Sequence, residues 1–486
     1  MNEELFLKGD EGLRFAMAHF GVDEALLRRT LALALKRGAH YADLFFEHSF
    51  RNRTDLRDGQ VKAVGATVDY GVGVRALSCD RTGYAYTEVV SDERLAEAAH
   101  AAAHIAAGMA TTHAPAPIAA LPQKSTGLYD VRRTWEDVGV EEKMAILQSL
   151  NDKIFSLDGR THKVRASLSD SSSIILFCNS LGEAFYDYRP MVALSVTCVM
   201  QSGGRTESAV AGRSFRMGMD ADTLQALVEE VAQEVVARTA ILFEAVRPRG
   251  GEMPVVMGAG ASGILLHEAI GHAFEADFNR KNVSIFSEML GKRICGKGIH
   301  VVDDGLITAN RGAVNFDDEG TAGQRTSIVT DGILSSFLHD RISATHYGVM
   351  PTGNGRRESF RHIPLPRMRA TYMEGGAYSE EEIIASVRKG IYAANFSNGQ
   401  VQIGAGDFTF FVKSGFLIEE GKLTRPVKDI NIIGNGPQAL ADITMVGNNY
   451  RMDNGTWTCG KDGQSCPVTC GMPSALVRKL TVGGEN

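Results

Sequence analysis

Hydrophobic and polar residues in the first half of the chain recur with the two periods that distinguish helices from strands. Apolar residues spaced three and four apart predict helices, the first of which is bounded by a capping Asp23 and by Gly38. Helices are expected at residues 24–36, 92–107, 140–155 and 223–243. Alternating polar and apolar residues predict strands at residues 41–48, 61–77, 164–178 and 184–200.

The second half has a different pattern, with short strand-like runs separated by Gly, Asn and Asp. A Pro- and Gly-containing stretch at residues 247–251 is the best candidate for a boundary between the halves. We therefore expect an α+β protein. Residues 1–245 would form an N-terminal mixed α/β domain with antiparallel strands and long helices, and residues 246–486 a large, mainly antiparallel β domain. One long strand-like run is residues 327–338, and only residues 379–388 are clearly helical after residue 299.

The β domain is expected to carry a helix with the sequence HEAIGH, in which His267 and His272 flank Glu268. Two imidazoles and a carboxylate are the groups of a hydrolytic zinc site. In the familiar HExxH motif the histidines are four residues apart and share one helical face. Here they are five apart, so that a regular α-helix would point them about 140° away from each other. The zinc interpretation requires a π-bulge between Glu268 and His272, a distortion that Gly271 makes easier.

A catalytic zinc site takes three protein ligands and leaves one position open, so that HEAIGH needs a third ligand from elsewhere. Glu275 and Asp277 follow closely, although ordinary polar positions at a helix end explain them as well. More distant candidates are His300, His339, His346, His362, Cys459, Cys466 and Cys470. The three cysteines lack the CxxC spacing of a structural zinc site, and a buried cysteine is ordinarily a small apolar residue.

Glu268 is the candidate for the catalytic group, because it is adjacent to a metal ligand without being needed as one. Its carboxylate could deprotonate a water molecule held by the metal and then pass the proton to the leaving amine. Zinc lowers the pKa of such a water from about 16 to about 7 in favourable sites. The alternative is that Glu268 is an exposed helix charge and that the histidines are ordinary core or surface residues.

Composition narrows the classes of function. The chain has 486 residues, 44% of them hydrophobic and 22% charged, which is typical of a globular protein with two domains. A net charge of −7 gives no general attraction to nucleic acid or to an anionic membrane, and no apolar run is long enough to cross a bilayer. Seven scattered cysteines and an acidic start without a secretory signal favour the cytoplasm.

Four segments of the sequence also carry a resemblance. The run HEAIGHAFEADFNRK, the turn at residues 453–455, the block TCGKDGQ at residues 458–464 and LTVGG at residues 480–484 resemble the TldD side of the TldD/PmbA (TldE) family of metallopeptidases. The similarity extends in order and length over essentially the whole chain. It implies that His267, His272 and Cys459 bind zinc and that Glu268 is catalytic. Cys466 and Cys470 have no counterpart in this pattern.

The resemblance also implies a partner and a substrate. Active members of the family pair with a homologous TldE/PmbA-type subunit that lacks the motif, and they degrade or trim unfolded peptides inside a closed chamber. Since this chain keeps HEAIGH, it resembles the catalytic subunit. A β-rich domain suits this role, because an exposed strand can hold an extended peptide through main-chain hydrogen bonds.

Three functions follow from these observations. The first is a zinc-dependent peptidase that acts on unfolded proteins or short peptides. The second is a non-enzymatic modulator of a protein partner such as DNA gyrase, in which the metal site is structural. The third keeps the metal and changes the substrate to a non-peptide amide or ester.

Overall fold

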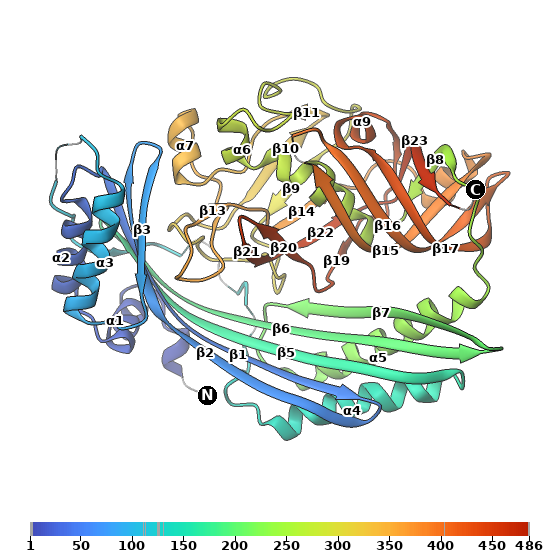
Figure 1. Cartoon of the computed structure of the whole chain (residues 1–486), viewed down its shortest axis with the longest axis horizontal. Helices are drawn as coiled ribbons and strands as arrows, with labels where there is room; N and C mark the ends of the chain where they lie inside the picture. The colour runs from blue at the N-terminus through green and yellow to red at the C-terminus, as the bar shows by residue number, and fades with distance from the viewer. Residues whose placement is uncertain are drawn as a thin grey trace.

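A long, curved antiparallel sheet dominates the N-terminal half of the molecule (Figure 1). The computed structural model describes residues 3–109, 111, 113–123, 127–129, 131–402 and 404–484. The strand order is β3-β2-β1-β5-β6-β4, and β7 also pairs with β6. The strands are β1 (Tyr41–Arg57), β2 (Gln60–Ser78), β3 (Arg81–Thr87), β4 (Ala119–Ala120), β5 (Thr161–Asn179), β6 (Glu183–Ser202) and β7 (Arg205–Phe215).

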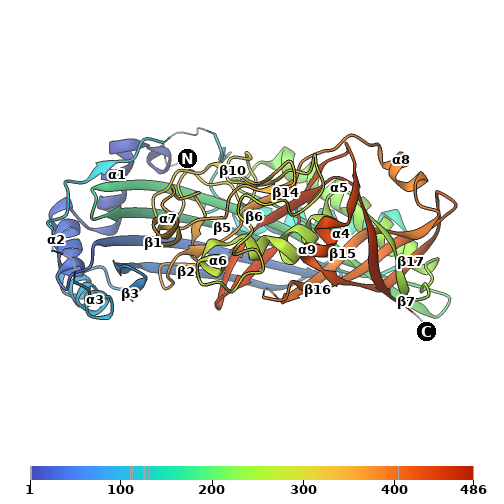
Figure 2. The same cartoon turned by 90° about the horizontal axis from the view of Figure 1, so that it is seen from above.

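Helices cover the outer face of this sheet in two groups, as Figures 1 and 2 show. They are α1 (Gly9–Phe20), α2 (Glu24–Leu35) and α3 (Asp92–Ile105) at one end, and α4 (Val140–Leu157) and α5 (Ala221–Ala240) at the other. Alternation along β6 explains the second group, because Leu194, Val196 and Cys198 all point into the core that α4 and α5 complete. The sheet therefore has one face buried under helices and one face turned toward the rest of the chain.

The C-terminal half lies over that second face and contains two six-stranded sheets. One has the order β17-β16-β15-β8-β23-β18 and the other β11-β10-β9-β14-β22-β19. The strands of the first are β8 (Gly251–Met257), β15 (Lys389–Gln402), β16 (Asp407–Glu419), β17 (Lys422–Asn435), β18 (Ile443–Val446) and β23 (Ala475–Gly483). Those of the second are β9 (Val301–Asp304), β10 (Arg325–Thr330), β11 (Ile333–Leu334), β14 (Ala370–Met373), β19 (Arg451–Asp453) and β22 (Thr469–Met472).

Two short hairpins and several short helices complete this half. The hairpins pair β12 (Gly355–Arg356) with β13 (Leu365–Pro366), and β20 (Thr458–Lys461) with β21 (Gln464–Pro467). The helices are α6 (Ala276–Arg280), α7 (Arg341–Tyr347), α8 (Glu380–Ala385) and α9 (Gly436–Ala441). The HEAIGH segment lies within the core of this half, where Leu265, Leu266 and Ile270 pack among side chains from both large sheets. Its position is therefore fixed from several sides.

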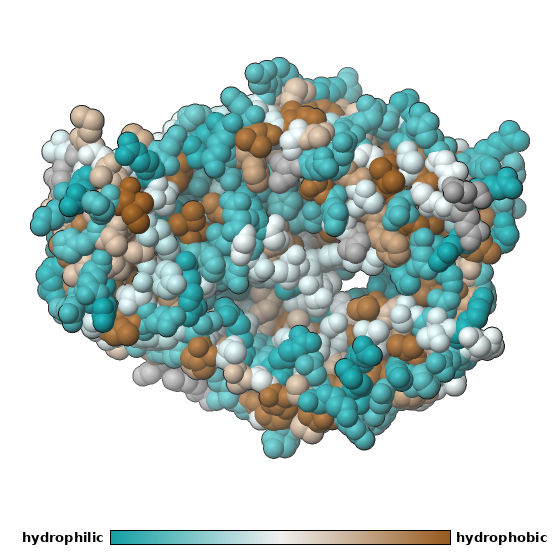
Figure 3. Space-filling view, viewed as in Figure 1, coloured by the Kyte–Doolittle hydropathy of each residue, from teal (hydrophilic) through white to brown (hydrophobic). Residues whose placement is uncertain are grey.

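Aromatic and charged contacts hold the two halves together. Phe45 and Phe177 of the long sheet form a small core with Phe316 and Phe360 of the C-terminal half. The buried Arg75 reaches across to Glu319, with 2.6 Å between Nη1 and Oε1. Contact is incomplete, because cavities of about 600 Å3 and about 430 Å3 remain between the halves. Figure 3 shows an opening in the surface between the two halves, at the place where β7 faces the C-terminal half in Figure 1.

The predicted fold class is confirmed, since the chain is a mixed α and β protein whose large sheets are mainly antiparallel. The four predicted helices and four predicted strands of the first half are present, although β1 is longer than expected. Asp23 caps α2 as predicted, accepting a hydrogen bond of 2.7 Å from the amide of Leu26. The division of the chain at residue 245 stays a prediction. No helix in the described ranges is long and apolar enough to cross a membrane.

Two expectations for the second half were wrong. Residues 327–338 do not form one strand, because Asp331 and Gly332 both have positive φ and turn the chain into the β10–β11 hairpin. Residues 379–388 contain α8, but α7 and α9 are helical as well. Both are a turn or two long, too short for apolar periodicity to identify them. Helix α1 and strand β7 of the first half were not predicted either.

Candidate metal centre

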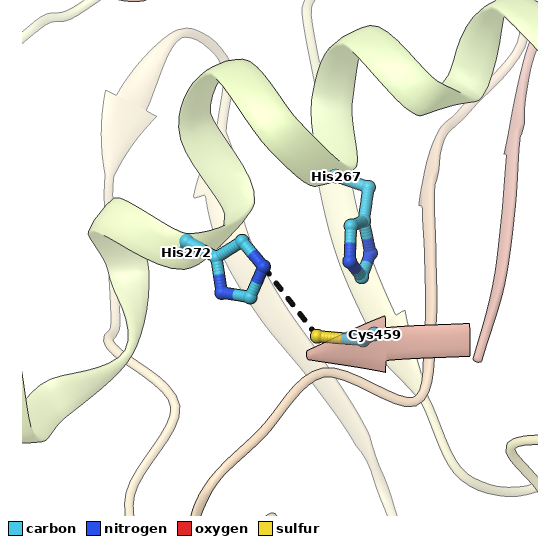
Figure 4. A group of neighbouring side chains, drawn as sticks. All are labelled: His267, His272 and Cys459. Atoms are coloured by element: carbon cyan, nitrogen blue, oxygen red, sulfur yellow. Dashed lines mark hydrogen bonds between the residues drawn. The ribbon is translucent and has the colours of Figure 1, made fainter. Parts of the chain in front are cut away.

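The HEAIGH segment is wound more widely than an α-helix. Residues Leu265–Gly271 form a π-helix, and a 3-10 turn at His272–Phe274 follows it directly. The amide of His272 donates to the carbonyl of His267, five residues earlier, as in a π-turn. The imidazole rings of the two histidines consequently lie side by side, with 5.1 Å between their centroids. The predicted departure from α geometry between Glu268 and His272 is confirmed, and Figure 4 shows both side chains on the same side of the helix.

Gly271 is required where this helix meets the segment before β14. A Cβ atom added at Gly271 would lie 2.3 Å from Sδ of Met368 and 2.8 Å from the carbonyl oxygen of Leu266. Both distances are below any normal contact, so that a side chain at this position would push the helix away from Met368. The wide turn and its close packing therefore depend on the same glycine.

We expect a Gly271→Ala substitution to destabilise the protein by about 1–3 kcal/mol, the usual range for overpacking a tight core. Urea unfolding followed by circular dichroism would measure the change. The matched control is Gly460→Ala, because a Cβ atom at Gly460, next to Cys459, meets nothing within 4 Å. Equal stabilities of the two variants would contradict the argument.

Three potential metal ligands converge at the wide turn. His267, His272 and Cys459 are buried, and one ligand atom from each lies within 4.8 Å of the others. The thiol of Cys459 comes from β20 and lies 3.4 Å from Nε2 of His272 (Figure 4). Neither ring nitrogen of His267 has a hydrogen-bond partner among the described residues. A buried imidazole left unpaired costs free energy, and a metal ion would satisfy it.

The electrostatics of the cluster suit a metal ion. Burial would raise the pKa of Cys459, but the neighbouring imidazoles of His267 and His272 outweigh this and lower it to about 4. Cys459 is therefore a thiolate at neutral pH, the form that binds metals. Two imidazoles and a thiolate form a donor set that suits zinc and leaves a fourth position open.

A buried ion-pair network orients His272. The ring Nδ1 of His272 lies 3.0 Å from Oε2 of Glu275, which leaves Nε2 facing Cys459. Lys461 donates to Glu275 over 3.0 Å and to Asp277 over 2.7 Å. Burial opposes ionisation of Glu275, yet Lys461 and His272 lower its pKa to about 2. A carboxylate behind a ligating imidazole fixes its tautomer and direction.

Lys461 is the cation on which this network depends. We expect Lys461→Met to destabilise the metal-free protein by about 3–5 kcal/mol at pH 7, because it leaves two buried carboxylates without their partner. The folded-state pKa of Glu275 is depressed from 4.5 to about 2, so that its contribution to stability is present above about pH 4.5 and is lost as the pH falls toward 2. The difference between wild type and variant should therefore shrink on acidification.

Urea unfolding at pH 7 and pH 4 in the presence of a chelator would measure this difference. Lys479→Met is the matched control, because the ion pair between Lys479 and Glu252 is exposed and should be worth less than about 1 kcal/mol. A loss in Lys461→Met that is no larger than in the control, or that grows at pH 4, would refute the prediction.

Glu268 lies beside the cluster rather than inside it. The residue is half-buried, and its Cγ lies 3.6 Å from the position that a Cβ atom at Gly399 of β15 would occupy. This part of β15 borders the 600 Å3 cavity through Asn395, Phe396 and Ser397. Thr458, which precedes Cys459, lines the same cavity. Glu268 thus follows the first potential ligand directly in sequence and contacts the strand that lines this cavity.

The other candidates for the third ligand lie outside the group. Glu275 and Asp277 face Lys461, and within the described part of the chain no potential metal group includes them. The same holds for His300, His339, His346 and His362. Cys466 lies opposite Cys459 in the β20–β21 hairpin, where its sulfur accepts from Arg367 over 3.4 Å. Burial raises the pKa of Cys466 and Cys470, so that both stay thiols at neutral pH.

Sequence reasoning missed the role of Lys461. A signal was available, because side chains two residues apart in a strand point to the same face, and Lys461 is two residues after Cys459. It also missed Arg367, whose guanidinium donates to the carbonyl of Cys459 over 2.7 Å. No local pattern marks a residue that is distant in sequence and acts through a main-chain oxygen.

Comparison with known protein families matches three segments of the chain. Residues 42–106 match PmbA/TldA metallopeptidase domain 1, and residues 133–243 match the central domain of the same proteins. Residues 250–484 match the PmbA/TldA metallopeptidase C-terminal domain, which includes the three potential ligands. The matched segments together cover most of the chain.

Individual proteins agree with these matches. A "Metalloprotease TldD homolog" of Haemophilus influenzae is 38% identical, covering 93% of this chain and 94% of that protein. A "Zinc metalloprotease TldD homolog" of Saccharolobus solfataricus is 28% identical, covering 92% and 95%.

Solved structures share the fold. TldE from Thermococcus kodakarensis superimposes with a TM-score of 0.73 at 17% identity, covering 94% of this chain and 100% of that one. A Thermotoga maritima protein, for which a role as modulator of a DNA gyrase has been suggested, gives a TM-score of 0.76 at 22% identity, covering 95% and 100%.

Proposed function

Because the chain belongs to the PmbA/TldD family of metallopeptidases, we propose that it is a zinc-dependent peptidase in which His267, His272 and Cys459 hold the metal and Glu268 is the catalytic base. The observation that carries this proposal is the convergence of the three buried ligand atoms within 4.8 Å of one another. The unpartnered nitrogens of His267 and the lowered pKa of Cys459 support a metal at this place. The zinc in the name of the Saccharolobus relative agrees with the donor set.

The residues around the cluster have separate roles in the proposed peptide hydrolysis. When bound, zinc acts as a Lewis acid that polarises the scissile carbonyl and acidifies water. Glu268 accepts the proton of the attacking water and donates it to the leaving amine. Glu275 keeps His272 in the tautomer whose Nε2 faces the metal position, and Lys461 holds Glu275 as a carboxylate. The buried ion pairs of Glu275 with His272 and Lys461 support the last two of these roles.

The cavity that β7, β15 and Thr458 line favours an extended, unfolded peptide as the substrate. Its volume is about 600 Å3, and β7 lines one side while β15 and β16 line the other. Strand β7 is an outer strand of the long sheet, and among the described strands it pairs with β6 alone. An extended peptide can add to such a strand through main-chain hydrogen bonds that do not depend on sequence. Short peptides and unfolded segments would fit this requirement, whereas a folded protein would not.

We infer further that the chain is the metal-carrying subunit of a heterodimer with a TldE/PmbA-type protein. The fold shared with TldE from Thermococcus supports a homologous partner, and the HEAIGH ligands on this chain support the catalytic role. Cleavage should therefore be measured for the chain alone and after mixing with such a subunit.

Mass spectrometry of a denatured protein mixture incubated with the zinc-loaded chain tests the proposed activity, with a Glu268→Gln protein beside it. New peptide termini that appear only with the wild-type protein would support a peptidase. The second candidate, a modulator of a partner such as DNA gyrase with a structural metal, draws on the role suggested for the Thermotoga protein. It predicts no new termini, and it predicts that a chelator unfolds the protein. A non-peptide amide or ester substrate also predicts no new termini, but metal removal would then leave the fold intact.

A further inference from the structure

A second cavity between the two halves of the molecule is lined mainly by arginine. Its volume is about 430 Å3, and seven arginines and three carboxylates line it. The lining comes from β1, β5 and β6 of the long sheet and from hairpin strands and loops of the C-terminal half. Positive charge therefore exceeds negative charge inside the molecule, although the chain as a whole carries a net charge of −7.

Four of these arginines have no acidic partner. Within the described residues, no carboxylate lies within 4.0 Å of the guanidinium of Arg216, Arg311, Arg356 or Arg369, whereas the other three arginines are ion-paired. The four are at least nine-tenths buried, and the hydrogen bonds that they donate to described residues all go to main-chain carbonyls. Arg311 illustrates this, because it donates to the carbonyl of Trp457 over 2.6 Å and its Nε has no partner in the described residues.

The protein compensates their charges only in part, since Asp317 and Asp318 raise the pKa of Arg369 less than burial and Arg356 lower it. Burial and the neighbouring Arg216 and Arg356 lower the pKa of Arg311 to about 10. Burial and Arg356 lower the pKa of Arg369 to about 9. Like charges gathered in a buried space destabilise the fold, and a bound anion would remove that cost. The planar guanidinium group binds carboxylates and phosphates in a two-point geometry.

The arginine-lined cavity adjoins the metal centre. Thr458 lines both this cavity and the 600 Å3 cavity, and it directly precedes Cys459. A second connection passes through residues 367–369. Arg367 donates to the carbonyl of Cys459, Met368 packs against Gly271, and Arg369 lines the arginine cavity. One bound peptide could therefore place an anionic group against Arg311 and Arg369 and a peptide bond at the metal centre.

We propose that the arginine-lined cavity binds a carboxylate of the peptide substrate, supplied by its C-terminus or by an acidic side chain, and so sets which peptide bond reaches the metal centre. The inference rests on the proposed peptidase function and adds a substrate preference to it. Peptides with a carboxylate a few residues from the scissile bond would be bound best. Uncharged peptides would rely on main-chain contacts alone.

Peptide binding to the zinc-loaded Glu268→Gln protein tests the proposal without requiring cleavage. Three forms of one peptide distinguish the sources of the carboxylate: the free acid, its C-terminal amide, and the free acid with its single Glu changed to Gln. We expect at least one neutralised form to bind ten-fold or more weakly by calorimetry. If only the amide is weakened the C-terminus is the source, and if only the Gln form is weakened the side chain is.

Substitutions in the same background assign the effect to the cavity. Arg311→Met and Arg369→Met should each reduce the affinity for the acidic peptide toward that for its neutral form. Arg325→Met is the control, because Arg325 forms a half-exposed ion pair with Glu374 outside the cavity and should leave affinity unchanged. If a cavity variant fails to fold, the comparison of the three peptides still shows whether a carboxylate is bound, since it needs no substitution in the cavity.

Equal affinity for all three peptides would overturn the proposal. So would arginine-dependent binding of inorganic phosphate that fails to compete with the acidic peptide. Failure of the peptidase function gives a different result, in which the acidic peptide binds selectively while the wild-type protein does not cleave it. Cleavage by the wild type without any preference for carboxylates would defeat the substrate preference and leave the peptidase standing.

Discussion

Replacing Glu268 with glutamine is expected to lower the rate of peptide cleavage by roughly 10²–10⁴-fold, the range found for general acid–base catalysis, while zinc content stays unchanged. Glutamine preserves the shape of the side chain but cannot accept a proton. Glu268 is not one of the three convergent ligands, so that its loss leaves the metal site complete. Initial rates on an unfolded peptide at pH 7, with and without a TldE/PmbA-type subunit, would measure the effect. Metal content would be measured on the same samples.

Glu288→Gln is the matched control for this experiment. Glu288 is exposed and lies outside the cluster, so that the same chemical change should leave the rate within about two-fold of wild type, as for most surface substitutions. Full cleavage by a pure, zinc-loaded Glu268→Gln protein would contradict the role of Glu268. That result would also favour the alternative in which the metal site is structural.

Replacing Cys459 with alanine is expected to weaken zinc binding by more than about a hundredfold and to abolish cleavage with it. Loss of an outer group around a zinc site already costs about 10–100-fold in affinity, and a thiolate in direct contact contributes more. Cys459 is the one ligand that carries a negative charge, since its pKa is lowered to about 4. Competition with a chromophoric chelator would measure the affinity, and circular dichroism would show whether the fold is kept.

Cys466→Ala provides the control, because Cys466 is equally buried and lies directly opposite Cys459 in the hairpin. Its thiol contacts Arg367 and not the histidines, so that zinc affinity should be unchanged. Retention of zinc by Cys459→Ala together with its loss in Cys466→Ala would reverse the assignment. A chelator that stops cleavage by the wild type and leaves its circular dichroism unchanged would favour catalysis over a structural metal.

Periodicity predicted those elements that have one covered and one open face. Strands β5 and β6 alternate because helices bury one face and the C-terminal half covers the other incompletely. Helix α4 follows the same logic, with Leu147, Leu150 and Ile154 on its buried side. In contrast, α7 owes its boundaries to the capping box of Asp340 and the left-handed Gly348 rather than to an apolar face. A search for apolar spacing does not detect such an element.

The metal centre was predictable in its local part only. The five-residue spacing of the histidines made a wide turn necessary, and the sequence around Gly271 permitted it. Cys459 could be identified through family resemblance, since no periodic pattern links positions 187 residues apart. The basic stretches at residues 355–357 and 361–369 are short and interrupted, so that the sequence favours solvated loop faces, whereas the structure buries Arg356 and Arg369 in the arginine cavity. Its unpaired members come from separate segments at residues 216, 311, 356 and 369, which only the folded chain brings together.

The wide separation between His272 and Cys459 also sets an order of events during biosynthesis. The ribosome adds His272 to the chain 187 residues before Cys459, and His267 earlier still, so that the nascent chain holds two of the three potential metal ligands for most of the time needed to make its C-terminal half. Contacts this distant in sequence form late, after the sheets that carry them. The β20–β21 hairpin must dock on the π-helix before the thiol of Cys459 joins the two imidazoles. The proposed hydrolytic centre is therefore complete only once the chain's own segments have left the unfolded state that such a centre would attack.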